Sequence, residues 1–290
     1  MIFDYRGGSW NLSERVRVVG ILNVTPDSFY DGGRYAAPEA AIARAEAMVA
    51  EGADAVDLGA ESTRPGAGAP LTAEEEWLRL EPVVSALVAR LPVPLSIDTS
   101  HAETARRALD QGAAIVNDVS GLTHEPAIAD HVARAGAGLV LMHAEGGPGR
   151  FHEPREYGDV ADEVAEFLGR QMRVAVERGV PERRIALDPG IGFSKRAEQS
   201  IAALRGLPRL TRLGRPVYIG VSRKSFLGAL TGRAVEARLA AGLGVTIAAI
   251  ALGARIVRTH DVRETADAVR AAEALLHPDL APKTPQPTRG

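Results

Sequence analysis

Eight apolar runs of strand length, separated by longer helical segments, constrain the fold of this chain more than any other feature. They are Val18–Val24, Ala55–Ala60, Pro94–Thr99, Ile115–Ser120, Gly138–His143, Ile185–Gly190, Pro216–Val221 and Arg255–His260. The segments between them place apolar residues three or four positions apart, as at Ala40, Ala43 and Ala47, which is the period of an amphipathic helix. Near-continuous Val, Ile and Leu runs joined by helices indicate a parallel sheet that is buried on both faces.

The number of these repeats predicts how the sheet is organised. Eight strand–helix repeats in about 250 residues favour a closed barrel. The alternative is an open, doubly wound sheet, which often carries a G-x-G-x-x-G motif after its first strand, and no such motif follows Val24. We therefore predict an α/β protein with a single (β/α)8 TIM barrel at residues 18–276. Residues 1–17 are expected to form a hairpin that caps the barrel, and the proline-rich residues 277–290 a disordered tail.

Composition and charge exclude several classes of function. A formal net charge of −3 gives no electrostatic case for binding nucleic acid or an anionic membrane surface. No run approaches the roughly 18 apolar residues of a membrane span, and Met1–Val18 carries charges where a signal peptide would be apolar. The chain has no cysteine, which rules out disulfides, thiol nucleophiles and cysteine metal sites, so we expect a cytoplasmic protein.

Polar residues gather where the predicted strands end, and in (β/α)8 barrels the C-terminal strand ends carry function. They are Asn23, Asp57 with Glu61, Asp98, Asn117 with Asp118, His143 after Met142, Asp188, Ser222-Arg223-Lys224, and Arg258 with His260. Because side chains alternate along a strand, only one of Asn117 and Asp118 can face the barrel mouth. Any one of these residues is also a common helix N-cap, and this is the interpretation we favour for Asp57, Asp118 and Thr99.

Lysine is scarce in this chain, which makes the position of Lys224 informative. Of 34 basic residues only three are lysines, leaving 31 arginines. A lysine ammonium is a compact donor whose pKa shifts readily on burial, unlike a guanidinium. We interpret Lys224 as a residue whose ammonium group has a functional role. The alternative is that lysine occurs at this position by compositional chance.

The strand ends divide into two predicted subsites. Closing a barrel makes the last strand a neighbour of the first, so Arg258 and His260 are expected beside Asn23. A guanidinium, an imidazole and a carboxamide oxygen suit a phosphorylated group with a bound magnesium ion. The alternative for His260 is a solvated residue that is hydrogen-bonded to the following helix.

The second subsite is expected near the barrel axis. Its members are Asp98, Asn117, Asp188 and Lys224. A carboxylate accepts two parallel hydrogen bonds, an amide donates and accepts, and an ammonium donates, so the set complements a 2-amino-pyrimidinone ring. Met142 and Phe193 are candidates for the apolar faces around such a ring, or for plain packing. The alternative for the whole set is an Asp–Lys ion pair that supports the barrel.

Two glycine- and proline-rich segments follow the first two predicted strands. They are Thr25–Arg34 and Glu61–Ala69. Long βα loops of this composition often act as lids or substrate clamps, and we expect that role here.

Seven short motifs in a fixed order resemble those of the dihydropteroate synthases, a family of pterin-binding enzymes. They are ILNVTPDSF at 21–29, ESTRPG at 61–66, SIDT at 96–99, NDVSG at 117–121, LDPGIGF at 187–193, SRKS at 222–225 and RTHDV at 258–262. The resemblance extends from Val18 to Leu276 and is specific because the motifs occur together. The chain departs from the family pattern at Ala144–Pro148, at Tyr30, where serine is usual, and at Ser200, where asparagine is common.

The resemblance implies a reaction of folate biosynthesis. In it, 6-hydroxymethyl-7,8-dihydropterin diphosphate condenses with 4-aminobenzoate to give 7,8-dihydropteroate and diphosphate, by dissociative loss of diphosphate and attack of the arylamine. The enzyme would be a transferase that requires Mg²⁺ and forms a homodimer. In the family, sulfonamides compete with aminobenzoate.

The resemblance also implies residue roles, with Lys224, Arg258 and Asp98 as the catalytic residues. The pterin would be held by Asp98, Asn117, Asp188 and Lys224, with Met142 and Phe193 near the ring. Diphosphate would be held by Asn23, Arg258 and His260, with Mg²⁺ at Asn23. The aminobenzoate site would be built from Phe29, Thr63, Arg64, Pro65 and Ser225.

Three other functions are kept as alternatives. A pterin-dependent methyltransferase on a related barrel would share the ring-binding carboxylate and amide. That function explains the presence of Lys224 and of the Arg258 and His260 pair less well. A Schiff-base aldolase would use Lys224 covalently. A catalytically silent paralogue would bind pterin diphosphate without turnover.

Overall fold

The computed structural model describes residues 1–24, 36–60 and 70–276 of the chain. The two predicted lid loops and the predicted disordered tail lie outside the described residues. Within them, none of the helices is long and apolar enough to cross a membrane.

Eight parallel strands close into a barrel in the order β10-β3-β4-β5-β6-β7-β8-β9. These strands are β3 (Arg17–Asn23), β4 (Ala55–Gly59), β5 (Leu95–Asp98), β6 (Ile115–Asp118), β7 (Gly138–Met142), β8 (Ile185–Asp188), β9 (Val217–Gly220) and β10 (Ala254–Thr259). Each of them falls within one of the eight apolar runs or extends it by one residue. The predicted (β/α)8 barrel is confirmed, and the open doubly wound sheet is wrong.

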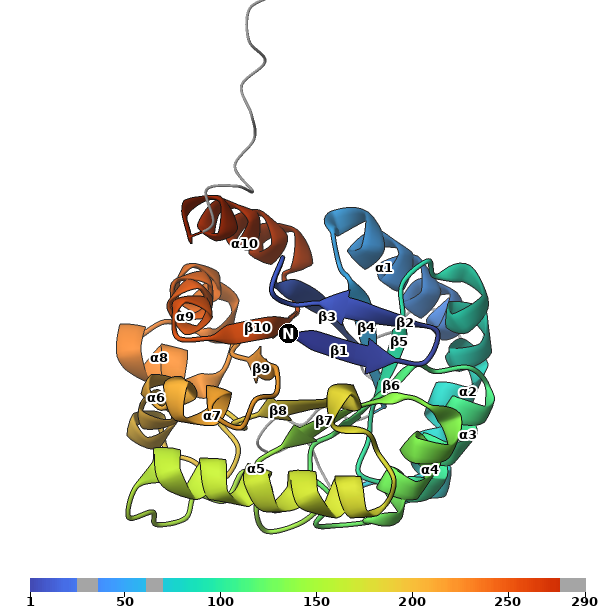
Figure 1. Cartoon of the computed structure of the whole chain (residues 1–290). Helices are drawn as coiled ribbons and strands as arrows, with labels where there is room; N and C mark the ends of the chain where they lie inside the picture. Colours follow the sequence, from blue (N-terminus) through green and yellow to red (C-terminus); the bar gives the residue numbers. More distant parts are fainter. Residues whose placement is uncertain (25–35, 61–69, 277–290) are drawn as a thin grey trace, which may run out of the picture.

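Helices form a ring outside the barrel (Figure 1). They are α1 (Ala36–Glu51), α2 (Ala73–Arg90), α3 (Ala102–Asp110), α4 (Ala127–Ala135), α5 (Val160–Glu177), α6 (Ala197–Arg205), α7 (Leu207–Thr211), α8 (Ser225–Thr231), α9 (Leu239–Ala251) and α10 (Val262–Leu276), with short 3-10 turns at Glu182–Arg184 and Val235–Ala237. Local sequence fixes their ends. Thr72 and Glu75 form a capping box at the start of α2, which satisfies two backbone N–H groups that the helix itself leaves unpaired.

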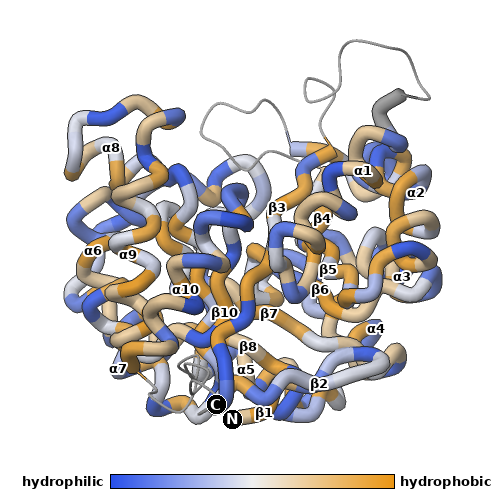
Figure 2. The backbone as a smooth tube through the Cα atoms, turned by 90° about the horizontal axis from the view of Figure 1, so that it is seen from above, coloured by the Kyte–Doolittle hydropathy of each residue, from blue (hydrophilic) through white to orange (hydrophobic). Residues whose placement is uncertain are grey.

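An N-terminal hairpin seals one end of the barrel, as predicted. Strands β1 (Ile2–Tyr5) and β2 (Gly8–Asn11) pair antiparallel and lie across that end (Figures 1 and 2). Their buried side chains Phe3 and Trp10 pack, with Leu12, against residues at this end of the barrel. Those residues are Val19, Ala55, Ala114, Ile115, Val140, Ala186, Tyr218 and Ile256. The residues at this end form an apolar plug. A functional site is therefore expected at the opposite end of the barrel, where the strands have their C-terminal ends.

Candidate active site

The barrel interior changes from apolar to polar toward the C-terminal ends of the strands. Ile115, Ala186 and Ile256 belong to the apolar plug. Side chains alternate between the two faces of a strand, so residues two or four positions further on face the same interior. The polar residues reached in this way are Asp57, Asn117, Asp188 and Arg258, with Asn23 four positions beyond Val19. The period of the strands therefore gathers these polar side chains at the barrel mouth.

Four strands contribute one lateral row of this mouth. In register, Asn23 of β3 pairs with Gly59 of β4, Gly59 pairs with Asp98 of β5, and Asp98 pairs with Asn117 of β6. A Cβ atom at Gly59 would lie 3.4 Å from the Asp98 Cβ and 3.5 Å from Asn23 Oδ1. The missing side chain at Gly59 thus lets the Asn23 carboxamide and the Asp98 side chain approach one another.

Arg258 lies at the centre of the charged network. Its Nε donates to Asp57 Oδ2 at 2.6 Å, and one of its terminal nitrogens donates to Asp98 Oδ2 at 2.6 Å. Asn117 Nδ2 also donates to Asp57 Oδ2, at 3.0 Å. Because Arg258 is predicted for the phosphate subsite and Asp98 for the ring subsite, this guanidinium links residues of the two predicted subsites.

The interpretation of Asp57 as a helix cap is wrong. Its side chain is fully buried and points into the barrel, because Asp57 shares the inward face of β4 with Ala55. Its carboxylate anchors Arg258 and Asn117 instead of a helix.

Asp118 and Thr99 lie outside the barrel interior, but their interpretation as helix N-caps is also wrong, because the N-cap residues of α3 and α4 are His101 and Pro126. Asp118 accepts hydrogen bonds from the Ser120 and Leu122 N–H groups, at 2.8 and 2.7 Å, and so caps a turn well before α4 begins. Thr99 accepts from the N–H of His101, at 3.0 Å, and His101 is the N-cap residue of α3. Asn117, and not Asp118, therefore faces the mouth.

Burial perturbs the acids of the site. It raises the pKa of Asp98 to about 7; the Arg258 charge opposes this rise and the Asp57 charge adds to it. Burial also raises the pKa of Asp188, against the attraction of Lys224. Buried carboxyl groups with a shifted pKa and specific charged partners are typical of functional sites.

Asp188 is held by a turn that only glycine can form. Its Oδ1 accepts from the Gly190 N–H at 2.7 Å. Gly190 adopts a φ of 66°, and a Cβ there would lie 1.9 Å from the carbonyl oxygen of His143. Any side chain at this position would displace the loop and, with it, the Asp188 carboxylate.

Lys224 follows a residue with unfavourable backbone geometry. Arg223 has a φ of 59°, a conformation that costs a non-glycine residue about 1–3 kcal/mol, and it forms an ion pair with Asp261. Lys224 Nζ donates to the Ile191 carbonyl and lies 4.7 Å from the centroid of the Phe193 ring. Burial lowers its pKa to about 8.

A cleft of about 300 Å³ opens beside this network. Its walls include the predicted site residues Asn23, Phe193, Lys224, Ser225, Arg258 and His260. Among the described residues of the predicted set, Asp98, Asn117, Asp188 and Met142 are not part of these walls. Asp98 lies behind the wall and forms an ion pair with Arg258, which is a wall residue.

The remaining predicted residues fall in different places. The His260 ring nitrogen Nδ1 lies 3.0 Å from Ser222 Oγ, which fixes the imidazole at the cleft. Met142 is buried in a small apolar cluster with Phe193. Phe29, Thr63, Arg64 and Pro65 lie outside the described residues, so only Ser225 of the predicted aminobenzoate site is described.

Lys195 is a feature of the site that sequence reasoning missed. Its side chain is buried, and Nζ lies 2.8 Å from His143 Nδ1 and 3.1 Å from each of the Gly190 and Phe193 carbonyl oxygens. Burial lowers its pKa to about 7. The lysine thus braces the loop that carries Asp188. Its rarity, which singled out Lys224, would have singled out Lys195 too.

Two departures from the family pattern keep a structural role. Ser200 Oγ accepts from the Gly192 N–H at 3.2 Å, so the serine still holds the loop after β8. In the variant segment 144–148, the Glu145 N–H donates to Ser194 Oγ at 2.8 Å. This bond ties the segment to the same loop.

Comparison with known proteins agrees with this geometry. The pterin binding enzyme family matches residues 19–260. A dihydropteroate synthase from Synechocystis sp. is 46% identical over 263 residues, which cover 90% of this chain and 91% of that protein.

Solved structures give the same result. The Xanthomonas albilineans dihydropteroate synthase with 4-aminobenzoic acid superposes with a TM-score of 0.87 at 42% identity, covering 95% of this chain and 98% of the other. The Thermus thermophilus enzyme in complex with 6HMPPP gives a TM-score of 0.82 at 40% identity, covering 95% and 100%. These similarities favour neither a methyltransferase nor an aldolase. The chain belongs to the pterin-binding enzymes and, within them, to the dihydropteroate synthases, the transferases of folate biosynthesis that condense a pterin with 4-aminobenzoate to dihydropteroate.

Proposed function

We propose that the barrel mouth binds 6-hydroxymethyl-7,8-dihydropterin diphosphate through Asp98, Asn117, Asp188 and Lys224. The observation that carries this assignment is a buried acceptor. Asn117 Oδ1 has no hydrogen-bond partner among the described residues, and leaving such an atom unpaired costs about 1–3 kcal/mol. An N–H donor of a bound ring would satisfy it.

The neighbouring groups supply the other half of the recognition. The 2-amino-pyrimidinone edge of a pterin presents adjacent N–H donors, which suit the carboxylate of Asp188, and a carbonyl oxygen, which suits an ammonium. Lys224 Nζ already donates to a carbonyl oxygen, that of Ile191. Phe193, which stacks on His152 with ring centroids 4.7 Å apart, offers an apolar surface beside the ring.

The leaving diphosphate is assigned to Asn23, Arg258 and His260 at the cleft wall. Mg²⁺ fits this position because it prefers oxygen ligands and commonly takes only one or two from the protein, with the rest from phosphate and water. Asn23 Oδ1, which lies beside the gap at Gly59, would be the protein ligand. When bound, the ion would neutralise charge on the diphosphate oxygens.

The proposed mechanism is dissociative and uses no side-chain nucleophile. Arg258 would stabilise negative charge on the leaving group, while Asp98 and Lys224 hold the pterin as positive charge develops on its methylene carbon. The aminobenzoate nitrogen then attacks that carbon. Catalysis consists of electrostatic stabilisation and positioning. Ser225, at the cleft wall, would contact the aminobenzoate together with Phe29 and the Thr63–Pro65 segment.

The two proposed subsites are separable by binding measurements on matched variants. Asp188→Ala should weaken binding of both 6-hydroxymethylpterin and its diphosphate, by about 10-fold or more, because a hydrogen bond to a charged group contributes about 1.5–3 kcal/mol. His260→Ala should weaken binding of the diphosphate alone. Equal losses for both ligands in both variants would refute the division into subsites.

Three further assignments stay predictions. The homodimer is implied by the resemblance, the cytoplasmic location is expected from the absence of cysteine, and the extent of the barrel at residues 18–276 is expected from the strand–helix repeats.

A further inference from the structure

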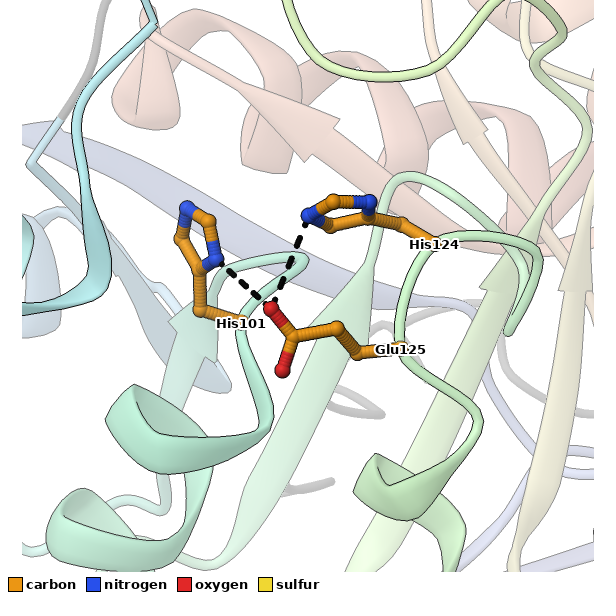
Figure 3. A group of neighbouring side chains, drawn as sticks. All are labelled: His101, His124 and Glu125. Carbon is orange, nitrogen blue, oxygen red and sulfur yellow. Dashed lines mark hydrogen bonds and ion pairs between the residues drawn. The ribbon is translucent and has the colours of Figure 1, made fainter.

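A cluster of potential metal ligands lies outside the network just described. His101 follows β5 at the start of α3, and His124 and Glu125 follow β6 before α4 (Figure 3). One ligand atom from each lies within 4.8 Å of the others. None of the three belongs to the proposed substrate or magnesium sites.

The spacing of these atoms approaches that of a coordination shell. Glu125 Oε1 is 3.0 Å from His101 Nδ1 and 3.5 Å from His124 Nε2. Metal–ligand bonds of about 2.0–2.1 Å in a tetrahedral zinc site place neighbouring ligand atoms about 3.3 Å apart. The two separations that involve Glu125 therefore bracket this value. A rotation of one imidazole would bring the ligand nitrogens of His101 and His124 to the same spacing.

Two of the ligands are already oriented by their other polar atoms. Glu125 Oε2 accepts from the Ala102 N–H at 2.9 Å, which turns Oε1 toward the histidines. His101 Nε2 lies 3.1 Å from the carbonyl oxygen of Leu71. Because a carbonyl only accepts, Nε2 carries a proton.

The proton on Nε2 makes Nδ1 the ligand atom of His101. A backbone carbonyl or carboxylate that fixes the second nitrogen is the usual support of a metal-bound histidine. Without a metal, the contact between His101 Nδ1 and Glu125 Oε1 requires a proton between these two atoms. A cation between the two atoms would replace that proton.

We propose that His101, His124 and Glu125 bind one divalent transition-metal ion of the zinc class. Two imidazoles and a carboxylate select Zn²⁺, Co²⁺, Ni²⁺ or Cu²⁺ over Mg²⁺ and Ca²⁺, so this site differs in chemistry from the magnesium position at Asn23. The side chains of His124 and Glu125 are 31% and 36% exposed, so water can complete the coordination. The ion would join the loops after β5 and β6 and, through His101, the backbone at Leu71 just before α2.

The test is Zn²⁺ titration calorimetry on metal-free, untagged full-length protein, with Co²⁺ absorption as a spectroscopic readout and Mg²⁺ as the control ion. The wild type is expected to bind one Zn²⁺ per chain at this cluster and to gain thermal stability. His124→Ala should weaken Zn²⁺ binding by about 10-fold or more and remove the Co²⁺ absorption, without loss of Mg²⁺-dependent turnover.

Two further variants keep the test decisive. His131→Ala removes a histidine on α4 that is not part of the cluster, and should bind Zn²⁺ like the wild type. Glu125→Gln retains an oxygen for the Ala102 N–H but removes the carboxylate, so it should also weaken Zn²⁺ binding. This second variant tests the proposal if His124→Ala fails to fold. Absence of Zn²⁺ binding to the wild type, or equal Zn²⁺ affinity in the wild type and the cluster variants, would overturn the proposal.

Discussion

Replacing Asp57 with asparagine should both destabilise the barrel and shift the pH dependence of catalysis. Asp57 is fully buried and its Oδ2 accepts from Arg258 at 2.6 Å and from Asn117 at 3.0 Å. Asparagine keeps the shape and one acceptor oxygen but removes the charge. A hydrogen bond to a charged group contributes about 1.5–3 kcal/mol and a neutral one about 0.5–1.5 kcal/mol. Only the Asn117 bond becomes neutral, because the Arg258 bond keeps its charged donor, so the expected cost is at least about 1 kcal/mol, or about 2–4 °C in Tm for a domain of this size.

The pH effect has a definite sign. The negative charge of Asp57 is one cause of the raised pKa of Asp98, which is about 7 in the free enzyme. Removing that charge lowers the pKa of Asp98, so Asp98 stays ionised to lower pH. The pH profile of kcat/KM reports groups of the free enzyme. Its acid limb should therefore lie near pH 7 in the wild type and at lower pH in Asp57→Asn.

Asp118→Asn is the matched control. Asp118 is also a buried carboxyl group, with a pKa that burial raises to about 6, but it caps a turn outside the barrel interior. This variant should lose stability and move the acid limb less than Asp57→Asn does, because the charge of Asp118 raises the pKa of Asp98 less than that of Asp57. An acid limb that stays in place or moves to higher pH in Asp57→Asn would refute the account of Asp98 and its neighbours.

Substitutions at three other positions test separate parts of the site. Lys224→Ala should lower kcat/KM by at least about 10-fold, the loss of one charged hydrogen bond, with an unchanged circular dichroism spectrum; unfolding would instead favour an ion pair that supports the barrel. Because the pKa of Lys224 is about 8, the wild-type kcat/KM should fall above that pH, and Lys224→Arg should remove this basic limb. Burial lowers the pKa of Lys195 to about 7, whereas an unfolded lysine titrates near about 10.4; the unfolded chain then binds more protons between these values, so stability should rise with pH across the window. Urea unfolding at several pH values should show a weaker rise in Lys195→Met, and an unchanged slope would count against the buried position of this lysine. Gly190→Ala places a Cβ atom where the His143 carbonyl lies, so Tm and pterin affinity should both fall; wild-type values for both would show that the turn tolerates a side chain.

The strands and their polar ends were predictable because two simple periodicities control them. An apolar run buried on both faces marks a parallel strand, and a polar residue at its end marks the barrel mouth. The alternation of side chains also allowed the choice between Asn117 and Asp118. The same rule places Asp57 inside the barrel, because Asp57 lies two positions beyond Ala55, and here the alternation of side chains is a better guide than the general frequency of helix caps.

What the sequence did not predict depends on contacts between distant segments. The pairing of Arg258 with both Asp57 and Asp98 joins residues 201 and 160 positions apart, and no local pattern reports it. The rarity of lysine marks Lys195 in the sequence, but its role depends on the loop after β8, which places it against His143. The cluster of His101, His124 and Glu125 requires two neighbouring βα loops to converge, which follows from strand order and not from spacing along the chain.

The central claim is that the barrel mouth joins two substrates with loss of diphosphate. It is tested most directly by measuring Mg²⁺-dependent release of diphosphate from the pterin diphosphate, with and without 4-aminobenzoate, together with detection of dihydropteroate. The account predicts dihydropteroate only when both substrates and Mg²⁺ are present. Tight binding of the pterin diphosphate with neither diphosphate release nor condensation would contradict it and identify a silent binding paralogue.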